Sequence, residues 1–113
     1  MAFYRASIGG GNEPPDYQWG YYASSVSGNY TYIFPYDFDY ICIGYNSDTT
    51  QGPTSNGYGK YNGNGTVLMN DVFNRYVHNI TIKNAKAGET FIIPRISYSN
   101  IYKHLFWIFG KKA

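Results

Sequence analysis

The sequence predicts an all-β fold: a single antiparallel β-sandwich or jelly roll behind a flexible, Gly/Pro-rich N-terminal arm. β-prone segments recur roughly every ten residues, with Gly, Asn, Ser or Pro between them. Apolar residues recur at helical spacing only within residues 66–77, and no internal repeat indicates a propeller or solenoid. Evenly spaced short strands are typical of sandwiches and jelly rolls.

A chain of 113 residues is long enough for one hydrophobic core, so we expect one domain over residues 16–113. Residues 1–15 form the predicted arm and linker, in which Phe3, Tyr4 and Ile8 precede three glycines and two prolines. Such a segment is either a disordered tail or an arm that docks on a neighbouring subunit. We favour the arm, which makes Phe3, Tyr4 and Ile8 candidate oligomer contacts.

The segment Asp39 to Tyr45 is the best-defined strand. Its side chains alternate between two apolar sets, Ile41, Ile43 and Tyr45 on one side and Tyr40, Cys42 and Gly44 on the other. A strand that is apolar on both sides is typical of a central position covered on both faces. Cys42 is the only cysteine, so we expect a buried thiol and no internal disulfide.

Before this strand, residues 17–26 and 29–34 are β-prone and flank a Ser-Gly-Asn turn signal, which predicts a hairpin. After it, residues 46–65 form the longest loop-like region, rich in Asn-Gly steps.

Residues 66–77 read as strand, turn at Met69 to Asp71, and strand, with a short helix as the alternative. Residues 76–83 alternate clearly, with His78 in the inward set as a structural histidine. Residues 90–98 form a strand in which Pro94 indicates an edge or a bulge, and residues 102–109 close the fold.

Aromatic residues make up 20% of the chain, including 14 tyrosines, whereas charged residues reach only 14%. One small core cannot hold all these rings, so we expect an aromatic surface that meets sugars, another protein or a second copy. The net charge of +2 comes without a dense Lys/Arg stripe, which argues against nucleic acid.

Long loops on a rigid β-scaffold are where binding residues tend to lie. The predicted loop presents three side chains to solvent, and two further rings lie near the start of the domain. The candidate sugar or protein contacts are therefore Trp19, Tyr21, Tyr58, Lys60 and Tyr61.

No catalytic, metal-binding or cofactor motif appears, so the sequence predicts a protein that is not an enzyme and that uses no metal or cofactor. Asp37 and Asp39 are two apart, but without further ligands nearby they read as solvated loop carboxylates. The remaining candidates for a hydrolase, including His78 and His104, are scattered without a recognisable order.

The first eight residues lack the apolar core of a signal peptide, and the apolar run from Leu105 to Phe109 is too short to span a bilayer. We therefore expect synthesis in the cytoplasm without a signal peptide and no membrane insertion.

Three stretches carry a resemblance to a known class of proteins. The opening residues 1–11, the strand at 38–45 and the turn at 86–90 resemble small tail-associated proteins of bacteriophages and prophages of Gram-positive gut bacteria. The resemblance covers about half of the chain. It implies a virion structural or host-attachment role, a homo-oligomer with a trimer favoured, contacts with other virion proteins and a host glycan, and no catalytic residues.

Overall fold

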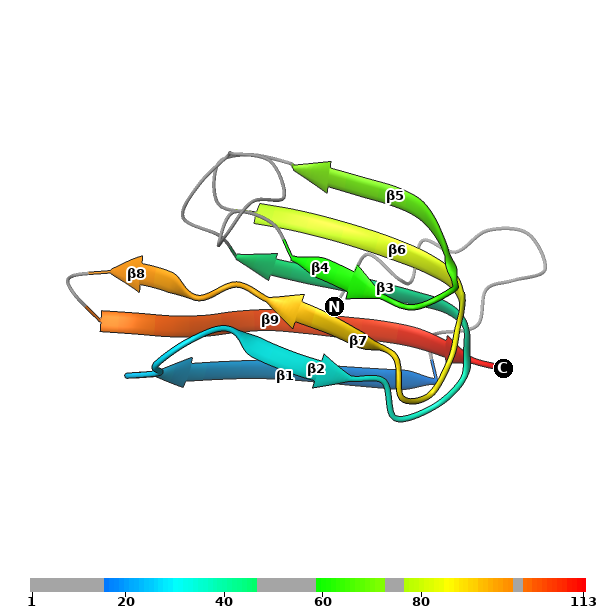
Figure 1. Cartoon of the computed structure of the whole chain (residues 1–113), viewed down its shortest axis with the longest axis horizontal. Coiled ribbons are helices and arrows are strands. Elements are labelled where there is room, and N and C mark those ends of the chain that lie inside the picture. The colour runs from blue at the N-terminus through cyan, green and yellow to red at the C-terminus, as the bar shows by residue number, and fades with distance from the viewer. Residues whose placement is uncertain (1–15, 47–58, 73–76, 99–100) are drawn as a thin grey trace.

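The computed structural model describes residues 16–46, 59–72, 77–98 and 101–113. These residues form nine strands and no helix (Figure 1), which confirms the predicted all-β class. The strands are β1 (Tyr17–Ser24), β2 (Tyr30–Ile33), β3 (Phe38–Asn46), β4 (Lys60–Asn62), β5 (Thr66–Val72), β6 (Val77–Ala85), β7 (Thr90–Ile93), β8 (Ile96–Tyr98) and β9 (Ile101–Lys112).

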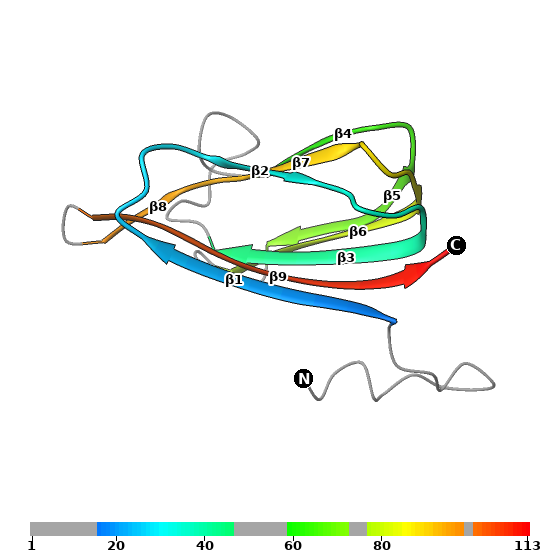
Figure 2. The ribbon, with the colours of Figure 1, turned by 90° about the horizontal axis from the view of Figure 1, so that it is seen from below.

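Two antiparallel sheets make up the fold. The larger sheet has the order β1-β9-β3-β6-β5, with β8 paired to β9, and the smaller has the order β2-β7-β4. Figure 2 shows them as two layers, with β2, β7 and β4 above the larger sheet. This arrangement is consistent with the predicted sandwich.

The predicted hairpin of residues 17–34 is wrong in its pairing, because its two strands lie in different sheets. β1 pairs with β9, and β2 pairs with β7. The chain turns a corner between them, where Ser25 adopts a positive φ of 61° and the Val26 amide donates to the Tyr102 carbonyl at 3.0 Å. A Ser-Gly-Asn signal fits such a corner as well as a two-strand turn.

β3 is the middle strand of the larger sheet, as predicted. Ile41, Ile43 and Tyr45 are buried between the sheets, but on the other side Tyr40 is exposed and Cys42 only half-buried. The expectation of two covered faces and of a buried thiol is therefore wrong. Instead, the Cys42 thiol lies on the outer face of the sheet and donates to the Asn79 side-chain oxygen at 3.1 Å.

Several predicted boundaries shift. The strand β4 lies inside the predicted loop, and β5 runs through Met69 to Asp71, where a turn was predicted. The last strand continues to Lys112. The single strand predicted over residues 90–98 is wrong, because the chain changes sheets at Pro94 and forms two strands, β7 and β8. Pro94 has no amide hydrogen to donate, so it cannot continue the ladder of β7.

The interior between the sheets is built from isoleucine and aromatic side chains. His78 is buried as predicted, and its ring stacks on Tyr45 at 5.2 Å and 20°. The buried cluster comprises Tyr32, Phe34, Phe38, Ile41, Ile43, Tyr45, Ile80, Ile82, Ala85, Phe91, Ile93, Phe106 and Ile108.

Candidate functional site

β1 is an edge strand of the larger sheet and β2 an edge strand of the smaller, and Figure 2 shows them in the two facing layers. Alternate side chains of each strand point inward because of the two-residue period of a strand. We call the cluster of rings along these two strands the aromatic edge; it comprises Tyr17, Trp19 and Tyr21 from β1 and Tyr30 and Tyr32 from β2.

Trp19 lies at the centre of the aromatic edge. Its ring stacks on Tyr32 with centroids 5.6 Å apart and on Tyr21 at the same distance. Tyr21 in turn contacts Tyr30 at 4.9 Å, and Phe106 meets Trp19 edge-on from the core at 5.4 Å. Offset and edge-on contacts each add about 0.5–1.5 kcal/mol beyond area burial. The rings thus support one another as one packed cluster.

Hydroxyl groups give the aromatic edge its polar part. The Tyr32 hydroxyl donates to the Tyr17 hydroxyl at 2.9 Å. Burial, followed by this hydrogen bond, raises the pKa of Tyr32 well above its ordinary value, and burial likewise raises the pKa of Tyr30. Both hydroxyls therefore stay protonated at neutral pH and can donate as well as accept a hydrogen bond.

A shallow, open recess of about 280 Å³ lies along the aromatic edge. Its lining consists of Tyr17, Trp19, Tyr30, Thr31, Tyr32, Ile33 and Pro35. Ligand cavities usually measure about 300–1,000 Å³. The recess suits one small ring that has an apolar face and hydroxyl groups, and it is too small for an extended cofactor.

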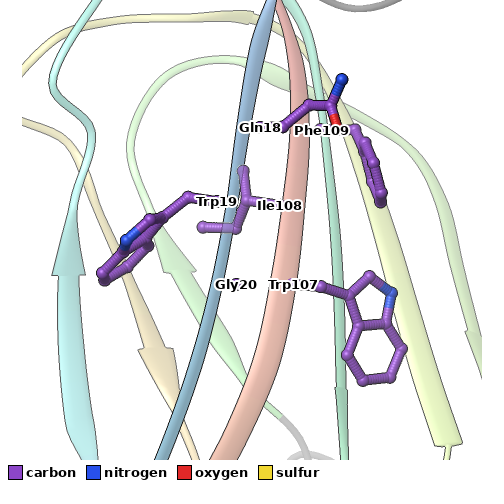
Figure 3. A pocket seen from close by; sticks show the side chains of 6 residues that line it. All are labelled: Gln18, Trp19, Gly20, Trp107, Ile108 and Phe109. Atoms are coloured by element: carbon purple, nitrogen blue, oxygen red, sulfur yellow. The ribbon is translucent and has the colours of Figure 1, made fainter. Parts of the chain in front are cut away.

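A second recess, of about 270 Å³, lies on the outer face of the larger sheet. Its lining consists of Gln18, Trp19, Gly20, Trp107, Ile108 and Phe109, so it shares Trp19 with the first recess. Figure 3 shows the Trp19 and Trp107 side chains on opposite sides of the β1–β9 pair. A Cβ atom at Gly44 would lie 2.1 Å from the Trp107 Nε1, which places the indole directly over Gly44. At Gly20 nothing lies within 4 Å of such a Cβ, so the backbone of β1 forms the floor of the recess.

Tyr61 occupies the opposite side of the smaller sheet, on β4. It is half-buried rather than exposed as predicted, and its ring lies parallel to Phe34 at 5.9 Å. Its hydroxyl donates to the Glu89 carboxylate and accepts from the Gly65 amide at 2.8 Å. Burial and the bond to Glu89 raise the pKa of Tyr61 to about 12. These contacts give Tyr61 a structural role.

The Glu89 carboxylate also accepts from the backbone amides of Asn64 and Lys86, both at 2.9 Å. Burial acts to raise the pKa of Glu89, but the hydrogen bonds from Tyr61 and the two amides outweigh it and lower the pKa. Glu89 thus fastens the β4–β5 turn to the β6–β7 turn, and we call this group the Glu89 latch.

The predicted contact residues do not form one site. Trp19 and Tyr21 lie together in the aromatic edge, whereas Lys60, which is exposed, and Tyr61 lie on β4 at the other edge of the smaller sheet. Tyr58 and the predicted oligomer contacts Phe3, Tyr4 and Ile8 lie outside the described residues.

Sequence reasoning missed Tyr17, Tyr30 and Tyr32 in the aromatic edge and Trp107 on the outer face. The alternation Tyr17, Trp19, Tyr21 and the pair Tyr30, Tyr32 were readable as one-sided aromatic rows. That the two rows face each other follows only from the placement of β1 and β2 in different sheets.

The ionisable groups of the described residues include no group of three or more His, Cys, Asp or Glu side chains placed to hold a metal ion. Asp37 has a structural contact, because its carboxylate accepts from the Ala87 amide at 2.9 Å. Within the same ranges, no helix has the length and apolar character needed to cross a membrane.

No protein-family model, curated protein or solved structure compared with this chain matches it. A functional assignment therefore depends on the chemistry of its own residues.

Proposed function

We propose that this chain is a non-enzymatic recognition protein that binds a surface polysaccharide through the aromatic edge. The observation that carries the proposal is the recess between β1 and β2, whose lining includes four aromatic rings and the hydrogen-bonded hydroxyls of Tyr17 and Tyr32. Sugars present apolar C–H faces and hydroxyl groups, which aromatic rings and phenol hydroxyls complement.

The size of the recess supports a short contact. At about 280 Å³ it holds one sugar ring, so we expect the protein to recognise a single unit, or the end, of a glycan chain. Single contacts of this kind are weak, and several identical copies in one assembly raise the avidity by about 10²–10⁴. A polysaccharide-binding role therefore agrees with a homo-oligomer.

A glycan array with the full-length protein tests the proposal, followed by titration calorimetry with a glycan that gives a signal. We expect Tyr30→Ala, at a ring that lines the recess, to weaken binding at least about tenfold, which corresponds to the loss of about 1.4 kcal/mol. Tyr40→Ala is the matched control, because Tyr40 is an exposed ring on the outer face of β3. Both variants are first compared with the parent protein by urea unfolding.

An array without signal would argue against the proposal. Equal loss of binding in both variants, with folding intact, would move the contact away from the aromatic edge.

A second role, a virion structural subunit such as a tail appendage or decoration protein, has its own support. Large apolar side chains are exposed on the edge strand β5, at Val67, Leu68 and Met69, and on β1, at Tyr22. Exposed apolar groups on an edge strand favour association with another chain. In this role the protein ends in the virion, where it binds its own copies and other virion proteins.

A further inference from the structure

We infer that a second copy of this chain packs on the outer face of the larger sheet, with Tyr22 of each copy inserted into the recess over Gly20 of the other. The inference deepens the assembly role proposed above and does not depend on carbohydrate binding. It starts from a projection and a recess that lie two residues apart on the same face of β1.

The projection is the Tyr22 ring, which is 58% exposed on the outer face. The recess has Gly20 as its floor, with Gln18, Trp107 and Phe109 around it (Figure 3). Its volume of about 270 Å³ is sufficient for an aromatic side chain. Because a knob and a matching hole lie on one surface, the surface is complementary to itself, which is the requirement for a two-fold contact.

The strand register allows both copies to insert Tyr22 into the recess of the other at the same time. A two-fold axis that lies between the facing sheets and crosses β1 at Tyr21 exchanges positions 20 and 22. Each Tyr22 then lies over Gly20 of the other copy. On β9, Leu105 is opposite Tyr22 and Trp107 is opposite Gly20. Leu105 of one copy therefore lies over the Trp107 indole of the other and adds an apolar contact.

Charge on the outer face is compatible with this pairing. The row Gly20, Trp107, Gly44 and Asn79, which crosses four strands, contains no charged side chain. Lys103 is opposite Ser24 on the neighbouring strand. The same axis therefore places Lys103 of one copy at the level of Gln18 of the other copy, away from the second Lys103. Like charges are thus not opposed across the contact.

The area of the face is close to that of a stable interface. Five strands about 4.8 Å apart, each roughly 25–35 Å long, present about 500–700 Å². Specific interfaces bury about 800 Å² on each partner. We therefore expect a dimer that dissociates in the micromolar range rather than an obligate one.

Light scattering coupled to size exclusion, with the full-length protein loaded at about 1–100 μM, tests the inference. We expect a concentration-dependent dimer whose dissociation constant rises at least tenfold in Gly20→Val and in Tyr22→Ala. A valine at position 20 meets nothing within 4 Å of its Cβ and favours a strand, so this variant fills the hole without disturbing the fold. Ile33→Ser is the control, because Ile33 is exposed on the smaller sheet.

A monomer throughout this range, a trimer, or a dimer that both variants leave unchanged would overturn the inference. Loss of the dimer in Phe3→Ser or Tyr4→Ser alone would assign the contact to the N-terminal arm instead. Each variant is checked by far-UV circular dichroism, so that unfolding is not mistaken for dissociation. Absence of glycan binding leaves this result unaffected, which separates it from the recognition role.

Discussion

At the level of single residues, the contact between Gly44 and Trp107 sets the shape of the outer face. The indole can lie flat across β3 only because position 44 lacks a Cβ. Trp107 leans away from β1 as a result, which leaves the recess over Gly20 open (Figure 3).

Gly44→Ala should therefore destabilise the fold. The new methyl group would lie 2.1 Å from the Trp107 Nε1, so the indole must move out of a packed position. Overpacking of this kind costs about 1–3 kcal/mol. Gly28→Ala is the control, because a Cβ there meets nothing within 4 Å. Urea unfolding followed by tryptophan fluorescence measures both; equal midpoints for the two variants would contradict the assigned position of Trp107.

At the level of elements, sequence patterns predicted individual strands correctly but failed to predict how distant strands pair. The alternation around Ile41 and Ile43 identified β3 correctly. The pairing of β1 with β9 joins the two ends of the domain, and a turn signal between neighbouring segments carries no information about it. The sequence does not predict β4, because its residues are typical of a loop. Its pairing with β7 and the hydrogen bonds of Tyr61 stabilise this strand.

The same reasoning applies to the candidate site. Trp19 and Tyr21 could be selected from sequence as aromatic residues of one strand. Their partners Tyr30 and Tyr32 could not be assigned to them, because a hairpin would have placed both strands in one sheet. The recess lies between two strands that neighbour each other in the sequence but belong to different sheets.

The Glu89 latch joins two turns, and its charge makes it sensitive to acid. Because its pKa is lowered in the folded state, the carboxylate contributes stability above its ordinary pKa of 4.5, and this contribution is lost as the pH falls through the folded value. Glu89→Gln should cost about 1–3 kcal/mol near neutral pH, the worth of hydrogen bonds to a charged group. The difference in the free energy of unfolding between Glu89→Gln and the parent protein should become smaller as the pH approaches 3.

Urea midpoints between pH 3 and 7 measure this effect. Asp39→Asn serves as the control, since it removes a carboxylate that is exposed on β3. A penalty for Glu89→Gln that stays constant with pH would mean that the charge of the latch does not matter.

At the level of the whole molecule, the tyrosines fall into two classes. In the part of the chain whose side chains the structure describes, four are exposed, and each has a cation over its ring. The distances to the ring centroids are 3.9 Å for Arg95 over Tyr102, 4.5 Å for Lys112 over Tyr36, 5.8 Å for Lys103 over Tyr22 and 6.0 Å for Lys83 over Tyr40. Contacts of this kind are worth about 0.5–1 kcal/mol at exposed sites. Four cationic side chains of the chain thus lie over exposed tyrosine rings.

The tyrosines of the second class lie in the interior, on both sides of the sandwich. We expect them to lower the stability of the fold at alkaline pH. Burial raises the folded-state pKa of Tyr30, Tyr32 and Tyr61 above the ordinary value of 10.0. Below pH 10 the folded and unfolded chains hold these protons equally. At higher pH the unfolded chain loses them first, so the free energy of unfolding falls as the pH rises.

We expect the urea midpoint to hold up to about pH 9 and to fall between about pH 10 and 12, in step with tyrosinate absorbance at 295 nm. Lysines also titrate in this range, so the decisive comparison is between variants. Tyr32→Phe loses about 1 kcal/mol at neutral pH with its hydrogen bond to Tyr17, but it should lose less further stability in alkali than the parent protein. Tyr36→Phe, at an exposed ring, should keep the parent profile. Identical alkaline slopes in all three proteins would show that the Tyr32 hydroxyl ionises as freely in the folded protein as in the unfolded one. That result would contradict a recess lined by buried, neutral hydroxyls.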